Sequence, residues 1–203
     1  MIKQGTPEWR QLRCGKLGAS QVYLAIARVK GAWGASRETL MKDLINERLT
    51  GEPTEGYINA AMQWGIDTEP HARSAYEWDF AVDVVQCGFI PHPRIANTGA
   101  SPDGLVGKGG IEIKCPGKST HIASVEDGFI AGRYVTQMHW QMAAASLEWV
   151  DFISFHPSYP EGLRLWVKRF ERDEKEISIL EEQVQEFLAE LDVRVNRLKE
   201  RIK

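Results

Sequence analysis

Cysteine is scarce in this chain, and the few residues present are not arranged for a structural role. The sequence contains three, Cys14, Cys87 and Cys115, which lie far apart and form no C-x-x-C motif. An odd number of widely spaced cysteines disfavours a disulfide framework, a zinc site and an iron–sulfur cluster. The pattern is typical of a protein in a reducing cytoplasm.

Long hydrophobic runs are also missing. No apolar segment approaches the length that spans a bilayer, and the N-terminal residues MIKQGTPEWRQ do not resemble a signal peptide. We therefore expect no membrane contact. With 203 residues, of which 43% are hydrophobic and 26% charged, the chain has the composition of a globular protein with a full core.

A positive net charge is a third absence. The formal charge is -3 at pH 7, whereas proteins that bind nucleic acid non-specifically are often strongly basic, so the bulk charge disfavours such a partner. The charges are unevenly distributed, however. Acidic residues concentrate after Glu171, and basic residues gather near the N-terminus, at Arg10, Arg13, Lys16, Arg28 and Lys30. A basic groove on a net-acidic protein is therefore compatible with the sequence.

The segment from Ser101 to Pro116 has the pattern of a β-hairpin. A short apolar run at residues 105–106 precedes a glycine-rich turn at 107–110, and a second strand follows at 111–115. Because side chains alternate along a strand, Glu112 and Lys114 share one face and the apolar residues share the other, which we expect to face the core.

The hairpin brings Asp103 back beside Glu112. Two carboxylates at one end of a buried sheet repel each other unless a cation lies between them, and oxygen ligands without His or Cys suit Mg²⁺ better than zinc. The alternative is structural, because Pro-Asp-Gly is a common turn and Glu-x-Lys a common polar face of an edge strand.

Near the N-terminus, Thr6 and the following proline predict a short helix that ends at Arg13, and Ser20 is placed to cap a second helix at about 21–27. A helix N-terminus with a hydroxyl and a nearby arginine is suited to bind an anion. The plain alternative is that Ser20 only caps the helix and that Arg13 only covers a solvated face.

Two longer helices are predicted next. Ser36 caps the first, which ends at Gly51, and the second runs from about Ile58 to Trp78 and carries Glu69. Pro70 either kinks this helix or begins a new one.

The second half of the chain alternates strands and helices. We expect a helix at 133–147, in which Gln137 and Gln141 share a face, and a long last helix whose apolar stripe, from Ile177 to Ile202, packs across the sheet or forms a subunit interface. Strands are predicted at 80–90, 95–100, 149–155 and 163–170. This order predicts one α/β domain with a mixed, twisted central sheet flanked by helices.

With these residues in place, the chain resembles the PD-(D/E)xK nucleases, and within them the phage lambda exonuclease, or YqaJ-like viral recombinase, family. Five blocks carry the resemblance in the same order, namely EWRQLRCGKLGAS, WGIDTEPHAR, SPDG, EIKCP and FERDEK. The likeness covers most of the chain. It implies a restriction-endonuclease-like core and a single exonuclease domain over residues 1–203.

The resemblance also assigns a metal site. Asp103, Glu112 and the backbone carbonyl of Ile113 would hold two Mg²⁺ ions, with Mn²⁺ as a substitute. Lys114 would orient or deprotonate the attacking water and offset charge at the phosphorus. Two such ions suit phosphodiester hydrolysis, because they activate the nucleophile and stabilise the departing oxyanion.

The surrounding residues receive roles by the same likeness. Glu69 matches the helical glutamate that completes the site, Gln137 the glutamine that supports it, and Met62 lies nearest the apolar wedge that splits the terminal base pair. Arg13 and Ser20, assisted by Ser101, match a pocket for the 5′-phosphate of a DNA end. A further cation of this pocket corresponds to either Arg28 or Lys30.

The resemblance implies a Mg²⁺-dependent 5′→3′ exonuclease that acts on linear double-stranded DNA and leaves a 3′ tail for recombination by single-strand annealing. It also implies a ring-shaped homotrimer, a phage-type annealing protein as partner, and the cytoplasm of a bacterium that carries the phage or prophage. Two alternatives remain. One is an endonuclease or repair nuclease with the same core, and the other is a non-catalytic DNA-binding assembly protein.

Overall fold

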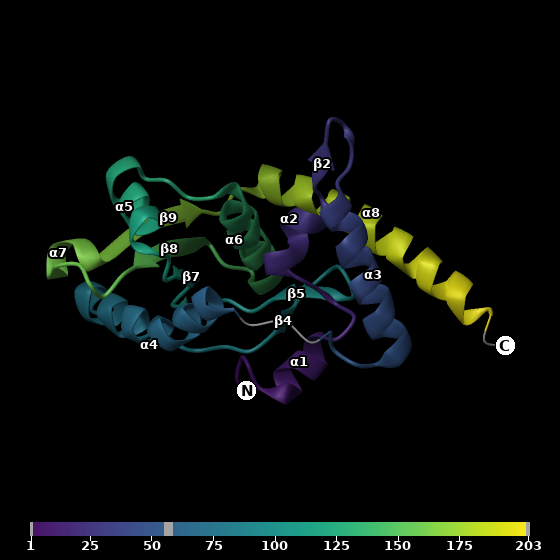
Figure 1. Cartoon of the computed structure of the whole chain (residues 1–203), viewed down its shortest axis with the longest axis horizontal. Coiled ribbons are helices and arrows are strands. Elements are labelled where there is room, and N and C mark those ends of the chain that lie inside the picture. Colours follow the sequence, from purple (N-terminus) through teal and green to yellow (C-terminus); the bar gives the residue numbers. More distant parts are fainter. Residues whose placement is uncertain (1, 55–58, 202–203) are drawn as a thin grey trace.

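A four-stranded sheet lies at the centre of the half of the molecule that carries the hairpin (Figure 1). The computed structural model describes residues 2–54 and 59–201. The strands follow the order β6-β7-β8-β9, in which β7 and β8 are parallel and the other pairs antiparallel. Their bounds are Gly104–Val106 for β6, Gly109–Lys114 for β7, Trp149–Phe155 for β8 and Leu165–Glu171 for β9. The predicted mixed sheet is confirmed, and so is the hairpin.

Helices cover both faces of this sheet. On one face, Ala72 and Tyr76 of α4 (Ala60–Phe80) pack against Ile111 and Ile153. On the other face, apolar side chains of α6 (Gly132–Ala145) pack against Val150 and Phe152 of β8. Because the second face is also covered, the polar residue Glu112 lies fully buried beneath α6.

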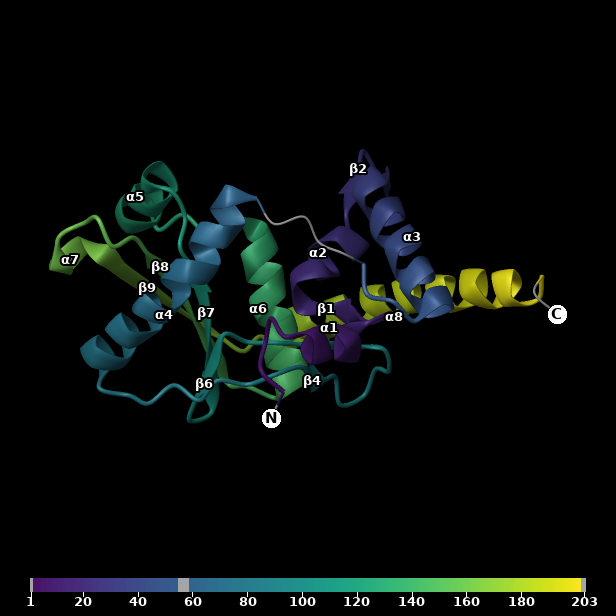
Figure 2. The same ribbon diagram turned by 60° about the horizontal axis from the view of Figure 1, so that its bottom comes forward.

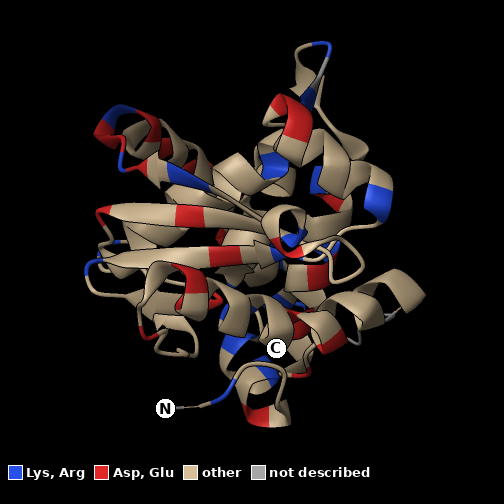
Figure 3. Ribbon diagram, turned by 90° about the vertical axis from the view of Figure 1, so that its left-hand side faces the viewer, with Lys and Arg blue, Asp and Glu red and all other residues tan. Residues whose placement is uncertain are grey.

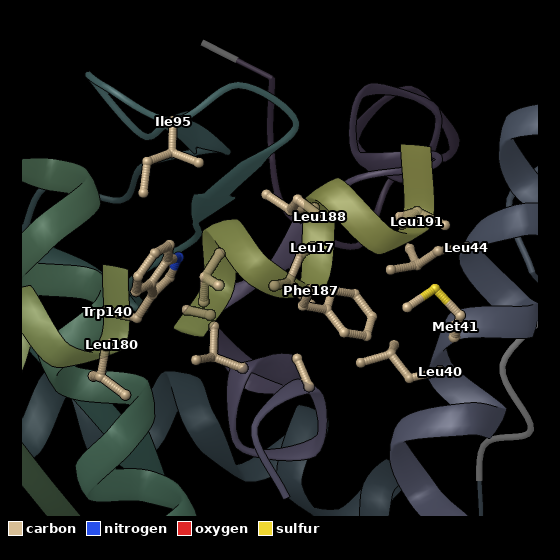
Figure 4. Packing of buried hydrophobic residues seen from close by; sticks show 14 of the residues in the cluster. Leu17, Leu40, Met41, Leu44, Ile95, Trp140, Leu180, Phe187, Leu188 and Leu191 are labelled. Atoms are coloured by element: carbon tan, nitrogen blue, oxygen red, sulfur yellow. The ribbon is translucent and has the colours of Figure 1, made fainter. Parts of the chain in front are cut away.

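A second core joins the N-terminal elements to the last helix. Phe187 of α8 (Glu174–Lys199) lies among Leu17, Leu40 and Met41, as Figure 4 shows. The predicted apolar stripe of this helix faces that core from Leu180 to Val195, whereas Ile177 packs into the core between α6 and β8. Figure 2 shows α8 running along α2 and α3 and extending past them.

The smaller elements complete the chain. A three-stranded sheet has the order β1-β5-β4, and β2 and β3 form a separate hairpin. Within the described ranges no helix combines the length and apolar character that crossing a membrane requires. The remaining bounds are α1 Pro7–Arg13, β1 Leu17–Gly18, η1 (a 3-10 helix) Ala19–Gln21, α2 Val22–Ala25, β2 Arg28–Val29, β3 Ala32–Trp33, α3 Ala35–Thr50, β4 Ile90–Pro91, β5 Thr98–Ala100, α5 Lys118–Asp127 and α7 Glu161–Arg164.

The strands predicted at 80–90 and 95–100 are largely wrong. Phe80 ends α4 instead, where its ring stacks on Tyr76 with the centroids 4.7 Å apart, and the following segment contributes only a bridge and the short β4. The second strand shrinks to β5 because the ring Nδ1 of His92 accepts hydrogen bonds from the backbone N–H groups of Arg94 and Ile95. Those bonds fold the chain into a turn before β5.

Two predicted helix caps are also wrong. Ser20 lies inside η1, whose N-cap is Gly18, and Ser36 lies inside α3, whose N-cap is Gly34. A glycine adopts the extended backbone that a cap needs as readily as serine does, and both N-caps lie two residues before the predicted ones. Pro70 lies within an unbroken α4. The helix start at Ile58 and the end of the stripe at Ile202 fall outside the described residues.

Trp140→Ala should destabilise the protein by about 3–5 kcal/mol. The ring of Trp140 is fully buried, stacks on His92 with the centroids 5.0 Å apart, and donates from Nε1 to Thr98 Oγ1 at 3.2 Å. Urea unfolding of the variant measures the loss. Trp78→Ala is the matched control, because Trp78 is 81% exposed. Equal stability of the two variants would contradict the prediction.

Candidate active site

The hairpin gathers the three predicted residues of the motif. Lys114 Nζ lies 2.5 Å from Glu112 Oε1, and Asp103 Oδ2 accepts a hydrogen bond of 2.7 Å from the backbone N–H of Ile113. A second backbone bond, from Asp103 N–H to Ile111 O at 3.2 Å, fixes Asp103 beside β7. The turn and the antiparallel pairing of β6 with β7 therefore place these charged groups together.

Two glutamines of α6 hold both oxygens of Glu112. Gln137 Nε2 donates to Oε1 at 2.8 Å, and Gln141 Nε2 donates to Oε2 at 2.5 Å. Gln141 is fully buried. It was not among the predicted site residues, although its spacing of one helical turn from Gln137 was a usable signal.

The charges of the cluster act on one another. Burial raises the pKa of Asp103 well above its usual range, the Glu112 charge raises it further, and Lys114 opposes the rise. Burial by itself would lower the pKa of Lys114, but the charges of Glu112 and Asp103 and the hydrogen bond to Glu112 outweigh it, so the pKa is raised. The lysine is therefore a fixed cation beside two carboxyl groups.

Glu69 approaches the cluster from α4 and is held by an arginine. Arg73, one turn later on the same helix, forms an ion pair with Glu69 and also donates to the carbonyl oxygen of Asp103 at 3.2 Å. The Arg73 side chain is mostly buried. Sequence reasoning missed it, although Glu and Arg four residues apart on a helix are a recognisable pair.

The oxygen atoms of the cluster fit a hard divalent cation. Among the described residues, no three His, Cys, Asp or Glu side chains are grouped so that they could hold a metal ion by themselves. An ion here would need Asp103, Glu112, the carbonyl of Ile113 and water, which is the oxygen-rich coordination typical of Mg²⁺. Asp103 is buried beside the charge of Glu112, and both effects raise its pKa, so a divalent ion would supply positive charge that stabilises the two carboxylates.

A second cluster surrounds Arg13. Its guanidinium lies 4.2 Å from the ring centroid of Trp9, and Trp9 Nε1 donates to Ser101 Oγ at 3.1 Å. Gly18 leaves room for it, since a Cβ at that position would lie 2.6 Å from an Arg13 nitrogen. Within the described part of the chain, Arg13 makes no ion pair. Trp9 joins two predicted residues but was not predicted.

The other predicted DNA contacts lie farther along the N-terminal half. Ser20 is exposed in η1, close in sequence to Gly18. In the β2–β3 hairpin, Arg28 stacks on Trp33, with its Cζ 3.8 Å from the ring centroid. Lys30 is in the turn between the two strands. This hairpin projects from the body with basic residues at its tip, whereas acidic and basic residues are interspersed over the rest of the face in Figure 3. The group of Asp103, Glu112 and Glu69 is called the acidic cluster. Among the described residues, neither Arg28 nor Lys30 is ion-paired to it.

A groove of about 1,010 Å³ opens beside the acidic cluster. Glu69 and Lys114 lie on its wall, and Met62, which is 51% exposed, lines it from the first turn of α4. Most of its lining is apolar and partly aromatic, from Trp64, Phe129, Ile130, Tyr134 and Phe152. Arg13, Ser20 and Ser101 are not part of this lining.

The chain is similar to one protein family over most of its length. The family model described as the YqaJ-like viral recombinase domain matches residues 8–148. No curated protein matches the chain significantly.

Solved structures of exonucleases are also similar to this chain. The crystal structure of an alkaline exonuclease, LHK-Exo, from Laribacter hongkongensis is 43% identical, with a TM-score of 0.89 over 97% of this chain and 98% of that one. LHK-Exo in complex with dAMP is 42% identical, with a TM-score of 0.90 over the same shares of the two chains. A phage-related exonuclease from Haemophilus somnus 129PT is 16% identical, with a TM-score of 0.69 over 90% of this chain and 96% of that one, a likeness of fold alone.

Proposed function

Because this chain belongs to the YqaJ-like viral recombinase family, we propose that it is a DNA exonuclease that removes nucleotides from one strand of linear double-stranded DNA in the 5′→3′ direction. An alkaline exonuclease of 43% identity that aligns over nearly the whole chain supports the reaction class. The observation that carries the proposal is the grouping of Asp103, Glu112 and Lys114 on the hairpin.

The proposed chemistry is metal-assisted hydrolysis of a phosphodiester. Asp103, Glu112 and the carbonyl of Ile113 would hold Mg²⁺, most simply as two ions, with Mn²⁺ able to replace it. When bound, such ions lower the pKa of water and offset charge on the phosphate. Lys114 places a positive charge beside the same oxygens, where it orients the attacking water and stabilises charge that develops at the phosphorus.

The neighbouring residues keep this arrangement fixed. Gln137 and Gln141 each hold one oxygen of Glu112, so that carboxylate cannot rotate away from the site. Arg73 holds Glu69 at the edge of the cluster. Groups that are positioned before the substrate arrives cost no reorganisation during the reaction.

End recognition is proposed for the cluster around Arg13. An arginine stacked on a tryptophan and without an ion pair is suited to bind a phosphate with two parallel hydrogen bonds. Together with Ser20 and Ser101 it would capture the 5′-phosphate, and this fixes which linkage reaches the acidic cluster. Met62 would act as the wedge at the terminal base pair, and Arg28 or Lys30 as a further DNA contact.

The wider setting is proposed from the same family likeness. Residues 1–203 would form one exonuclease domain that assembles as a ring-shaped homotrimer around DNA, which reconciles a net charge of -3 with a DNA substrate. The 3′ tail would pass to a phage-type single-strand annealing protein in the cytoplasm of the bacterial host.

Digestion of 5′-phosphorylated duplex DNA, labelled along its length, tests the proposal. With Mg²⁺ we expect release of 5′ mononucleotides from linear duplex, none from covalently closed circles, and none when a chelator is present. Degradation of closed circles would favour an endonuclease with the same core. Binding without any cleavage of linear duplex would favour the non-catalytic assembly protein.

A further inference from the structure

The first turn of α5 has three backbone N–H groups that find no partner in the described part of the chain. The helix has 10 residues, and its N-cap is Gly117, which has no side chain to accept a capping hydrogen bond. The first helical bond runs from His121 N–H to the Gly117 carbonyl at 3.0 Å. The N–H groups of Lys118, Ser119 and Thr120 precede it and make no hydrogen bond among the described residues. Free N–H groups and the helix dipole favour an anion at such an end.

The sequence at this end adds suitable side chains. Gly117 to Thr120 reads Gly-Lys-Ser-Thr, separated from the end of β7 by two residues, and this order begins the helix of nucleotide-phosphate loops. The complete loop motif is absent, because its first glycine would fall at Glu112. What is shared is the local chemistry of exposed amides, one lysine and two hydroxyls around a single anion.

A buried histidine, His156, directly follows β8 and lines the groove beside the start of α5. His156 is 6% exposed and lines the groove that Gly117 and Thr120 also line. Its Nδ1 accepts a hydrogen bond of 3.2 Å from the backbone N–H of Ser158, so in the neutral ring the proton is on Nε2. That Nε2 makes no hydrogen bond within the described part of the chain. Among the described residues this N–H therefore has no protein acceptor, and it is not one of the fully enclosed polar atoms, so it is accessible from solvent.

The ring of His156 lies 6.2 Å from the ring of His121 in α5, measured between centroids. Burial lowers the pKa of His156, and the nearby charges of His121 and Lys118 lower it further. The ring also lies 5.7 Å from Trp64, measured between centroids, and Trp64 lines the groove from α4. The imidazole of His156 and the start of α5 thus line one region of the groove, and Lys118 is exposed on the first turn of that helix.

This region is close to the proposed cleavage site. Gly117 follows Lys114 by three residues, and a chain of that length spans at most roughly 10 Å. Lys114 and Glu69 line the same groove, whereas Arg13 and Ser101 do not. If the 5′-phosphate binds at Arg13, the strand on the other side of the scissile linkage continues into this groove.

We propose that the first turn of α5, with Lys118 and His156, binds the phosphate that follows the scissile linkage on the 3′ side of the strand being cut. This inference rests on the proposed function. It defines a second phosphate seat beyond the terminal one, so that two anchored phosphates hold the linkage between them in register with the acidic cluster. A linkage held at both ends is confined to the geometry in which it reacts.

Single methylphosphonate linkages test the seat, because they remove the charge of one phosphate at a time. The substrates are 5′-phosphorylated linear duplexes with all phosphates, with a methylphosphonate at the second linkage, or with one at the sixth. The proteins are the parent, Lys118→Ala and the control Lys108→Ala, whose exposed lysine pairs with Glu148 at the other end of β7. Lys118 is exposed, so its replacement should leave the fold intact.

The quantity compared is kcat/KM for release of the first nucleotide. In the parent and in Lys108→Ala, the second-linkage methylphosphonate should lower it about tenfold, the effect of one charge-assisted contact. In Lys118→Ala it should cost about twofold or less, while all-phosphate DNA is itself cleaved about tenfold less efficiently. The sixth-linkage analogue should behave like natural DNA in all three proteins.

An equal cost of the second-linkage analogue in Lys118→Ala and in the parent would overturn the seat. Inhibition by dAMP that depends on Lys118, without any linkage effect, would also overturn it and would assign the anion to the released nucleotide. Failure of the proposed function is seen separately, as no cleavage of the all-phosphate duplex by the parent.

Discussion

Lys114→Ala is expected to lower the turnover of linear duplex DNA by about a thousandfold, the upper range for removing one group that stabilises developing charge. The ammonium lies 2.5 Å from Glu112 and is the positive charge closest to the two carboxyl groups. Without it, charge at the phosphorus loses its stabilisation. DNA binding should change little, because most contacts with DNA are made to other phosphates. Single-turnover cleavage and fluorescence anisotropy measure the two quantities.

Two controls make that result specific. Lys108→Ala removes a lysine from the turn before β7 and should cleave DNA as the parent does. Thermal unfolding of Lys114→Ala checks that Glu112, still held by two glutamines, stays in a folded site. Unchanged turnover in a folded Lys114→Ala protein would show that the lysine has no part in the chemistry.

Arg13→Ala should erase the preference for 5′-phosphorylated over 5′-hydroxyl ends, which we expect to be about a hundredfold in the parent. The guanidinium is held against Trp9 and forms no ion pair among the described residues, so its charge is available to a terminal phosphate. The measurement is kcat/KM for otherwise identical duplexes with each kind of end.

The matched control for this variant is on the same helix. Arg10 lies exposed on α1, and Arg10→Ala removes the same charge from a position one turn away. It should keep the preference of the parent. The same preference in Arg13→Ala as in the parent would reject the pocket, whereas cleavage of both ends at the slower rate would support it.

Local sequence signals were sufficient for the hairpin. Gly107 allows the tight turn before β7, because it has a positive φ of 55° that other residues adopt rarely. Alternation along β7 then decides which side chains share a face. For the same reason the strand at Trp149–Phe155 and the stripe of α8 were predictable, since both patterns repeat over several residues in a row.

Local signals failed where a distant contact decided the structure. The valine-rich segment after Phe80 has the composition of a strand, yet only Val85 forms a bridge there, because the neighbouring strand β6 is short. Ser20 and Ser36 fit the pattern of helix caps, but glycines two residues earlier cap those helices. Composition describes what a segment can form, and the available partners decide what it does form.

The sequence by itself determined the fold class, the family and the order of the acidic residues and lysine on one hairpin, because each depends on residues near one another in the chain. Tertiary structure alone decided that Gln141 as well as Gln137 donates a hydrogen bond to Glu112 and that Arg73 pairs with Glu69. It also decided that Trp9 contacts both Arg13 and Ser101. Those pairs join separate elements or depend on which rotamer a packed side chain adopts. The packing of α6 against the sheet brings Gln141 to Glu112, the packing of α1 against the β5–β6 connection brings Trp9 to Ser101, and the packing of α4 lets Arg73 bind the Asp103 carbonyl as well as Glu69.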